Sequence, residues 1–139
     1  PAGVLLPKVG AAADVAAAAA ALGDAGGADL PLWVMAETPA GILALDAIAA
    51  STARIAVVVL GTADLAKALR LPDGARSAAL GTAAGLAVLA ARARGLDILS
   101  GIYPDLADTA GFEAACRADR AAGFDGKTRS MSQDTQRTE

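Results

Sequence analysis

Short apolar runs alternate along this chain with longer alanine-rich segments, and the two patterns predict strands and helices in turn. The continuous apolar runs at residues 32–36 and 55–60 are typical of strands covered on both faces, as in parallel sheets. Further strands are predicted at residues 4–7, 97–101 and 124–128. The segments between strands are rich in good helix formers. We expect helices at residues 11–22, 39–50, 62–70, 77–94 and 109–122.

Capping residues support these helix boundaries. Thr38 precedes a proline in the first helical turn, which is a favoured way to begin a helix. Asp108 or Thr109 is placed to cap the last helix. Gly95 and Gly123 follow the last residues of two helices, where glycine commonly ends a helix.

Strands separated by helices predict a parallel sheet with right-handed crossover connections. Both a (β/α) barrel and an open doubly wound sheet have this pattern. The chain has no G-x-G-x-x-G after the first strand and no G-x-x-x-x-G-K-[ST] motif. The common nucleotide-binding forms of the open sheet are therefore less favoured.

Composition refines this picture. The 139 residues are a usual length for one domain, and 55% are hydrophobic. Aromatic residues make up only 3%, so the core must consist of alanine, valine, leucine and isoleucine. Residues 129–139 hold a single apolar residue, too little to bury a segment. We predict one domain at residues 1–128 and a polar, disordered tail at residues 129–139.

Charge and cysteine content exclude several classes of function. With a net charge of −3 and few aromatics, the chain has no surface that would attract nucleic acid. No apolar run approaches the roughly 20 residues of a membrane span, and no signal peptide opens the chain. Cys116 is the only cysteine and the chain has no histidine to activate it, so we expect it either to pack or simply to be tolerated at the surface. A cytoplasmic location fits these features.

Two carboxylates are the main candidates for chemistry. Glu37 follows the strand at residues 32–36, and Asp64 follows the strand at residues 55–60 after a short turn. The carboxyl ends of parallel strands are where α/β proteins place their active sites. Two oxygen ligands without histidine favour Mg²⁺ over zinc. The alternative is that both acids only complement the positive ends of helices.

The turn beside Asp64 offers a candidate substrate site. Gly61, Thr62 and Ala63 lead into a helix, and their backbone N–H groups are placed to bind a carboxylate. An ordinary strand-to-helix turn would look the same. Lys8 follows the first strand and is expected at the same edge, either facing the site or simply in solvent.

Other residues have simpler expected roles. Trp33 is predicted to lie in the core. The acidic residues inside helices are expected to face water: Asp14, Asp46, Glu113 and Asp119.

Five motifs resemble those of the HpcH/HpaI aldolase/citrate lyase β-subunit-like family, which includes citryl-CoA and malyl-CoA lyases and malyl-CoA thioesterases. The motifs follow one another in the family's order over residues 4–128. They are L-P-K-V (6–9), W-V-M-A-E-T-P-A-G (33–41), V-L-G-T-A-D-L-A-K (59–67), A-A-R-A-R-G-L-D-I-L-S-G-I-Y-P-D (90–105) and G-F-D-G-K-T (123–128).

The resemblance implies a TIM (β/α)₈ barrel, of which this chain holds roughly the fourth to eighth strand–helix units. On this basis the family's catalytic arginine, on the third strand, lies outside the chain, so its catalytic residue is unknown here. Residues 129–132 stand where the family continues with two apolar residues and His-Pro. The chain therefore resembles part of a family member with an unusual end.

The resemblance also implies a function. Such enzymes use Mg²⁺, here held by Glu37 and Asp64, to cleave a carbon–carbon bond in a β-hydroxyacyl-CoA and release an acyl-CoA and a keto acid. The alternatives are a malyl-CoA thioesterase of the same family and an inactive, non-catalytic fragment. Substrates would be a CoA thioester and a keto acid, Tyr103 and Pro104 would line the CoA channel, and the intact protein would be a homo-trimer or homo-hexamer.

Overall fold

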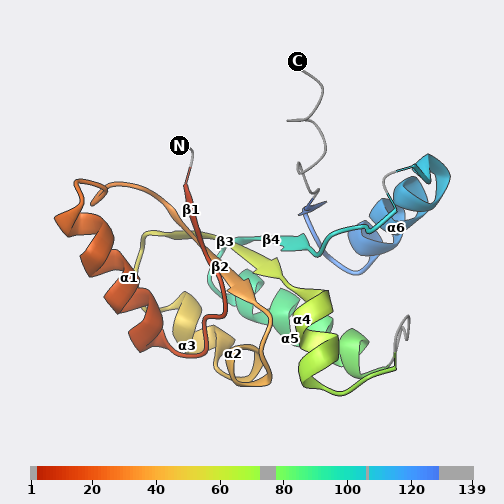
Figure 1. Ribbon diagram of the computed structural model, residues 1–139, viewed down its shortest axis with the longest axis horizontal. Helices are drawn as coiled ribbons and strands as arrows, with labels where there is room; N and C mark the ends of the chain where they lie inside the picture. Colours follow the sequence, from red (N-terminus) through yellow and green to blue (C-terminus); the bar gives the residue numbers. More distant parts are fainter. Residues whose placement is uncertain (1–2, 73–77, 106, 129–139) are drawn as a thin grey trace, which may run out of the picture.

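The computed structural model describes residues 3–72, 78–105 and 107–128, and these form an α/β structure around one parallel sheet (Figure 1). The sheet order is β1-β2-β3-β4-β5. The strands are β1 (Val4–Leu6), β2 (Leu32–Ala36), β3 (Ile55–Leu60), β4 (Asp97–Ser100) and β5 (Gly126–Lys127). The helices are α1 (Ala12–Asp24), α2 (Pro39–Leu43), α3 (Leu45–Ala49), α4 (Thr62–Ala68), α5 (Ala78–Ala93) and α6 (Thr109–Ala121).

The strand order decides between the two architectures that the sequence left open. Every strand pairs in parallel with the strand that follows it in the chain. A doubly wound sheet reverses its strand order at a switch point, and no reversal occurs among these strands. The fold is therefore a run of consecutive β/α units, as in a TIM barrel.

Most predicted elements are confirmed, with differences at their ends. The helix expected at residues 39–50 is divided into α2 and α3, because Ala44 has φ −97° and ψ 5° and interrupts the regular helix. The last strand is limited to Gly126–Lys127. The tail expected at residues 129–139 lies outside the described residues.

The predicted caps are present. The side chain of Thr38 accepts a hydrogen bond from the backbone N–H three residues later, at 3.0 Å, and Asp108 does the same at 2.8 Å. Gly95 and Gly123, which end α5 and α6, have φ values of 67° and 96°, where glycine is favoured. Thr38 and Asp108 thus begin helices that follow the carboxyl ends of strands, whereas Gly95 and Gly123 end helices before the next strand begins.

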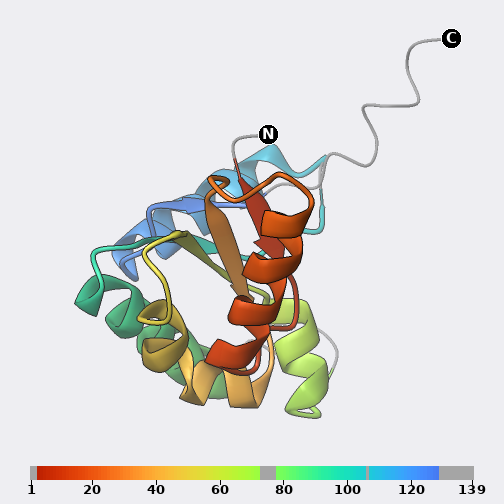
Figure 2. The same ribbon diagram turned by 90° about the vertical axis from the view of Figure 1, so that its left-hand side faces the viewer.

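The core lies between the sheet and the helices α1, α3 and α5, which cover one face of it (Figure 2). In β2 the alternate residues face this core, as the pleat of a strand requires. The best-buried residues are aliphatic, as the composition predicts. They are Val15, Leu32, Val34, Leu45, Ile48, Ile55, Val58, Leu60, Leu65 and Ile98, each at most 3% exposed.

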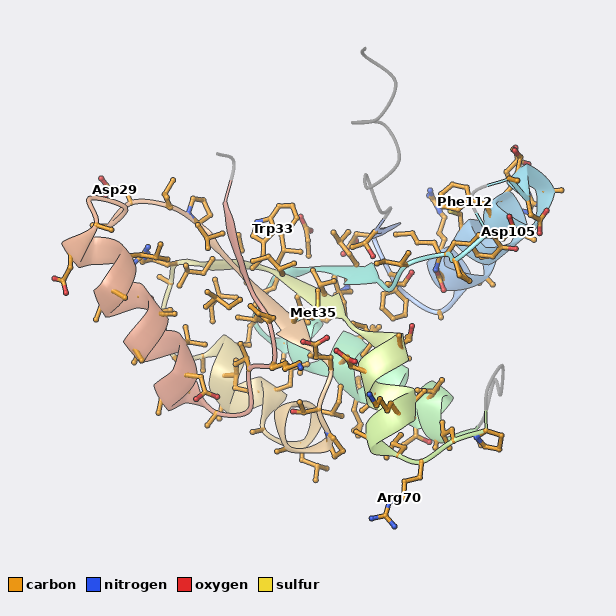
Figure 3. All side chains as sticks on the ribbon, in the orientation of Figure 1. Asp29, Trp33, Met35, Arg70, Asp105 and Phe112 are labelled. Atoms are coloured by element: carbon orange, nitrogen blue, oxygen red, sulfur yellow. The ribbon has the colours of Figure 1, made fainter. Side chains whose placement is uncertain are left out.

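The prediction that Trp33 lies in the core is wrong. Trp33 is only half-buried, because it occupies an alternate position of β2 and so points to the opposite face from Leu32 and Val34. Figure 3 shows Trp33 on the side of the sheet away from α3 and α5. In a closed barrel this face would be the interior.

No helix within the described residues is long and apolar enough to cross a membrane.

Candidate metal and substrate site

Three neighbouring strands bring the candidate residues to one edge. β1, β2 and β3 pair in parallel, so their carboxyl ends lie side by side. Ala36 pairs with Leu60, which places the following residues, Glu37 and Gly61, next to each other. α4 begins directly afterwards and carries Asp64 in its first turn. The expected adjacency of these two strand ends is therefore confirmed.

The backbone of the turn that follows β1 holds Glu37 at this edge. Its side chain is 5% exposed, and its Oε1 accepts a hydrogen bond from the backbone N–H of Lys8 at 2.8 Å. A buried carboxylate requires such partners, since burial removes the water that would otherwise solvate it. Oε1 is thus occupied by a fixed donor.

Gly61 leaves space beside the other oxygen of Glu37. A Cβ at position 61 would lie 2.5 Å from Glu37 Cβ and 2.8 Å from Glu37 Oε2, closer than real Cβ contacts. Glycine is therefore needed here for the close approach of the two strand ends. The space that this glycine leaves open adjoins Oε2 on the side where α4 begins.

This arrangement fits Mg²⁺. The ion prefers oxygen ligands and keeps several waters, so two protein carboxylates suffice. Glu37 and Asp64 supply that chemistry, and Asp64 is exposed on the first turn of α4. Among the described residues no cluster of three or more His, Cys, Asp or Glu side chains forms a denser metal site.

The predicted roles of the turn residues need one correction. The N–H of Gly61 donates to the carbonyl oxygen of Ala36 at 3.0 Å, so it is already used within the sheet. Gly61 contributes space rather than a donor. Thr62 and Ala63 open α4, where the first N–H groups of a helix lack acceptors within it. Binding of a carboxylate by these two N–H groups stays a prediction.

Lys8 acts through its main chain. It has a positive φ of 53°, which turns the chain so that its N–H points to Glu37. Its side chain is exposed. Sequence reasoning placed Lys8 at the correct edge but could not show that its backbone holds the carboxylate.

A second polar group was not predicted. Ser100 and Lys127, at the ends of β4 and β5, both hydrogen-bond to Asp119 Oδ2 of α6, Lys127 Nζ at 2.8 Å. Lys127 Nζ also donates to Ser100 Oγ at 3.0 Å. Asp119 was expected to face water, and this is wrong: its side chain is 26% exposed and that of Lys127 is 11%.

Asp108 orders the loop that follows β4. It accepts hydrogen bonds from the N–H of Gly111 and from the hydroxyl of Tyr103, each at 2.8 Å. Both bonds lower the pKa of Asp108, and the bond from Gly111 has the larger effect. The ring of Tyr103 also packs edge-to-face on Phe112. Figure 3 labels Phe112 and Asp105 at the α6 end of the molecule.

Comparison with curated proteins gives two kinds of relative. The chain is 45% identical over 125 residues to a (3S)-malyl-CoA thioesterase of Cereibacter sphaeroides, covering 90% of this chain and 42% of the relative. It is 34% identical over 146 residues to an L-malyl-CoA/beta-methylmalyl-CoA lyase of the same species, covering 89% of this chain and 46% of that relative. The chain thus spans less than half the length of these relatives.

Solved structures share the fold. RipC from Yersinia pestis superposes with a TM-score of 0.82 at 25% identity, over 93% of this chain and 58% of that one. A citrate lyase β subunit from Mycobacterium tuberculosis, complexed with oxaloacetate and magnesium, superposes with a TM-score of 0.75 at 26% identity. The match covers 92% of this chain and 55% of that one. The family model HpcH/HpaI aldolase/citrate lyase matches residues 1–131. The chain belongs to the HpcH/HpaI aldolase/citrate lyase family.

Proposed function

We propose that this chain carries the Mg²⁺-binding edge of an enzyme that hydrolyses a malyl-CoA-type thioester. The thioesterase relative is more similar than the lyase relative, at 45% against 34% identity. The sequence had favoured the lyase, and the comparison supports its alternative better. The substrate is a CoA thioester; a keto acid is a product of the lyase reaction and a substrate only of the reverse condensation.

One observation carries the metal part of the proposal. Glu37 is buried, and one of its carboxylate oxygens accepts a hydrogen bond from the N–H of Lys8. Its other oxygen faces the space that Gly61 leaves open. Such a carboxylate is positioned in advance and does not need to be ordered by a ligand. A related structure, the Mycobacterium tuberculosis citrate lyase β subunit, is complexed with magnesium and oxaloacetate.

The residues then have distinct tasks. Glu37 and Asp64 hold the ion, and the N–H groups of Thr62 and Ala63 bind the substrate carboxylate. The ammonium of Lys8, exposed at the same edge, adds positive charge near that carboxylate. Mg²⁺, when bound, supplies polarisation of a carbonyl oxygen. The catalytic arginine expected from the family resemblance would come from outside this chain.

Binding of Mg²⁺ to the 139-residue chain tests the metal site. Asp64→Asn should abolish most of the binding, measured by isothermal titration. Asp29→Asn is the matched control, because Asp29 precedes β2 and lies at the other end of the strand, as Figure 3 shows. Equal Mg²⁺ affinity in Asp64→Asn and the parent would exclude Asp64 as a ligand.

A second test uses the space beside Glu37. Gly61→Ala should weaken Mg²⁺ binding, because the added Cβ displaces Glu37. Gly85→Ala on α5 is the control, since a Cβ there meets nothing within 4 Å. Loss of binding in both variants would show a general loss of fold instead.

The lyase remains the second candidate, supported by the 34% identical relative. Malyl-CoA distinguishes the two: a thioesterase releases a free thiol without a keto acid, whereas a lyase releases a keto acid without a free thiol. We expect little turnover of either kind from this chain alone, because the expected arginine and part of the barrel lie outside it. Rapid turnover by the chain would contradict this expectation.

The assembly of the intact protein into a homo-trimer or homo-hexamer stays a prediction, which analytical ultracentrifugation of that protein would test.

A further inference from the structure

The outer side of α5 carries exposed apolar side chains. Leu86 and Leu89 of α5 are 42% and 69% exposed, and Leu43 of α2 is 82% exposed. All three line one groove of about 330 Å³ between the two helices, together with Ile42 and Ala90. An exposed apolar patch that is contiguous, rather than made of single scattered residues, marks an interaction site.

The rest of a barrel would not cover this patch. α5 connects β3 to β4, the third and fourth strands of the five-stranded sheet. Further strand–helix units would join the sheet at its free edges, β1 and β5, and so would lie away from α5. The molecule that covers the patch therefore comes from outside this barrel.

Charge favours a second copy of this chain as that molecule. The chain has a net charge of −3, so two copies repel each other over much of their surface. Residues 78–91 contain no charged residue. At the border of the groove, Asp46 is neutralised by Arg94, with which it forms an ion pair at 2.8 Å. Two identical copies can therefore approach through α5 without bringing like charges together.

The outer side of α5 is also complementary to itself. Gly81, Gly85 and Leu89 are four residues apart and so lie along one side of the helix. A Cβ at either glycine would meet nothing within 4 Å, whereas Leu89 projects into solvent. In an antiparallel pair of α5 helices centred on Gly85, Leu89 of each copy lies over Gly81 of the other. In a parallel pair, leucine would meet leucine and glycine would face glycine.

We propose that the outer side of α5, with Leu43 of α2, is a self-association surface through which two copies of this chain pack antiparallel about a two-fold axis. Both copies use the same patch, so the contact closes at two copies. A homo-trimer uses two different patches of each subunit, so this contact is not one of the interfaces of a trimer.

The size of the patch sets the strength of the contact. α5 has 16 residues and is therefore about 24 Å long, and with α2 beside it the patch is roughly 20 Å wide. It offers roughly 500 Å² per copy, against about 800 Å² per partner in a standard stable interface. The expected dimer is weak, with a dissociation constant above about 1 µM.

Sedimentation equilibrium of the 139-residue chain tests the surface. The parent should pass from monomer to dimer between about 5 and 500 µM. Leu89→Glu should raise the dissociation constant at least about tenfold, because it places a charge in both halves of an apolar contact. Leu43→Glu serves as a second variant if Leu89→Glu does not fold. Ile102→Glu is the matched control, since Ile102 is 56% exposed and lies outside the patch.

Gly81→Leu tests the orientation of the two copies. In the antiparallel pair the added side chain meets Leu89 of the other copy, so the dissociation constant should rise by about fivefold or more. In a parallel pair the same change would add apolar contact and lower the dissociation constant. An unchanged or lower value would contradict the antiparallel contact.

Amide NMR spectra of the parent locate the contact by residue. On dilution from about 500 to 5 µM, the signals of Gly81 and Gly85 should move. Those of Gly23 and Gly26, at the end of α1, should stay in place, because they lie outside the patch although a Cβ there would also meet open space.

Three outcomes would overturn the proposal. The first is a parent that stays monomeric up to about 500 µM, which would assign the patch to a different protein. The second is a trimer, because a three-fold contact needs two different patches. The third is a dimer that Leu89→Glu and Leu43→Glu leave as stable as that of the parent.

Discussion

Helices α3 and α5 cover β2 and β3 with aliphatic side chains, whereas α6 is attached to β4 and β5 through polar groups. Leu45 and Ile48 of α3 and Ala87 and Ala91 of α5 are at most 1% exposed and belong to the core. No described residue of α6 belongs to that core cluster. α6 bonds instead through Asp119 to β4 and β5.

This difference predicts different responses to change. Burial of apolar surface is non-directional and depends on volume. Hydrogen bonds and ion pairs depend on geometry and on pH. We therefore expect core substitutions to unfold the whole chain, and substitutions near α6 to release that helix first.

The largest expected effect is from Leu45→Ala. Leu45 is 1% exposed, and its truncation should cost about 2–5 kcal/mol of unfolding free energy. Leu43→Ala is the matched control one helical segment away, because Leu43 is 82% exposed and should change stability by less than about 0.5 kcal/mol. Urea denaturation followed by circular dichroism measures both. Equal losses would show that α3 is not part of the core.

Lys127→Met should have a smaller and more local effect. It removes the bonds to Asp119 and Ser100 and leaves a carboxylate without its cation, at a cost of about 1–3 kcal/mol. Hydrogen exchange should become faster in α6 while β2 stays protected. Arg117→Met is the control, since its pair with Glu113 is exposed and 3.6 Å long. A uniform loss of protection in β2 and α6 would contradict the comparison.

Acid should loosen the α6 end next. The guanidinium of Arg92, followed by the N–H of Ile98, lowers the pKa of Asp125 below 3.8. The folded state therefore binds this proton more weakly than the unfolded state, so the stabilisation is present above the unfolded pKa and is lost as pH falls through the folded pKa. Thermal unfolding between about pH 4 and pH 2 should show this loss. Arg92→Met should make this loss of stability with falling pH smaller. An unchanged dependence of stability on pH would refute the assignment of the loss to Asp125.

The smallest effect is expected at the ion pair between Asp46 and Arg94, which joins α3 to the end of α5. Both side chains are exposed, at 61% and 40%, so water and salt screen their attraction. Asp46→Asn should lower the midpoint of unfolding less than either Leu45→Ala or Lys127→Met, and added salt should remove the difference. A large effect that persists in high salt would place this pair in the core.

The fold was more predictable from the sequence than the site. β2 and β3 are continuous apolar runs, and their pattern is local. The face of Trp33 depends on which side of the sheet the helices cover, and this is not a local property. The bond from Lys8 N–H to Glu37 spans 29 residues and uses a backbone donor, which no residue type reveals.

The sequence was sufficient to place a residue relative to the end of its own strand, because that position is local. Glu37 follows β2 directly and Asp64 lies in the first turn of the helix after β3, so the parallel topology brings both to one edge of the sheet. The donors of Gly61 and the partners of Asp119 depend on neighbours that are distant in the sequence or in other elements. Composition and periodicity carry no information about such contacts.

The backbone origin of the bond to Glu37 has a consequence for how this edge can vary. Because the donor is an N–H, the side chain at position 8 is free to change without altering how Glu37 is held. Glycine or asparagine should be accepted there, since they adopt the φ of 53° readily. Proline alone combines a forbidden φ with a missing N–H. A library at position 8 would therefore retune the charge at the mouth of the site while its innermost carboxylate stays in place.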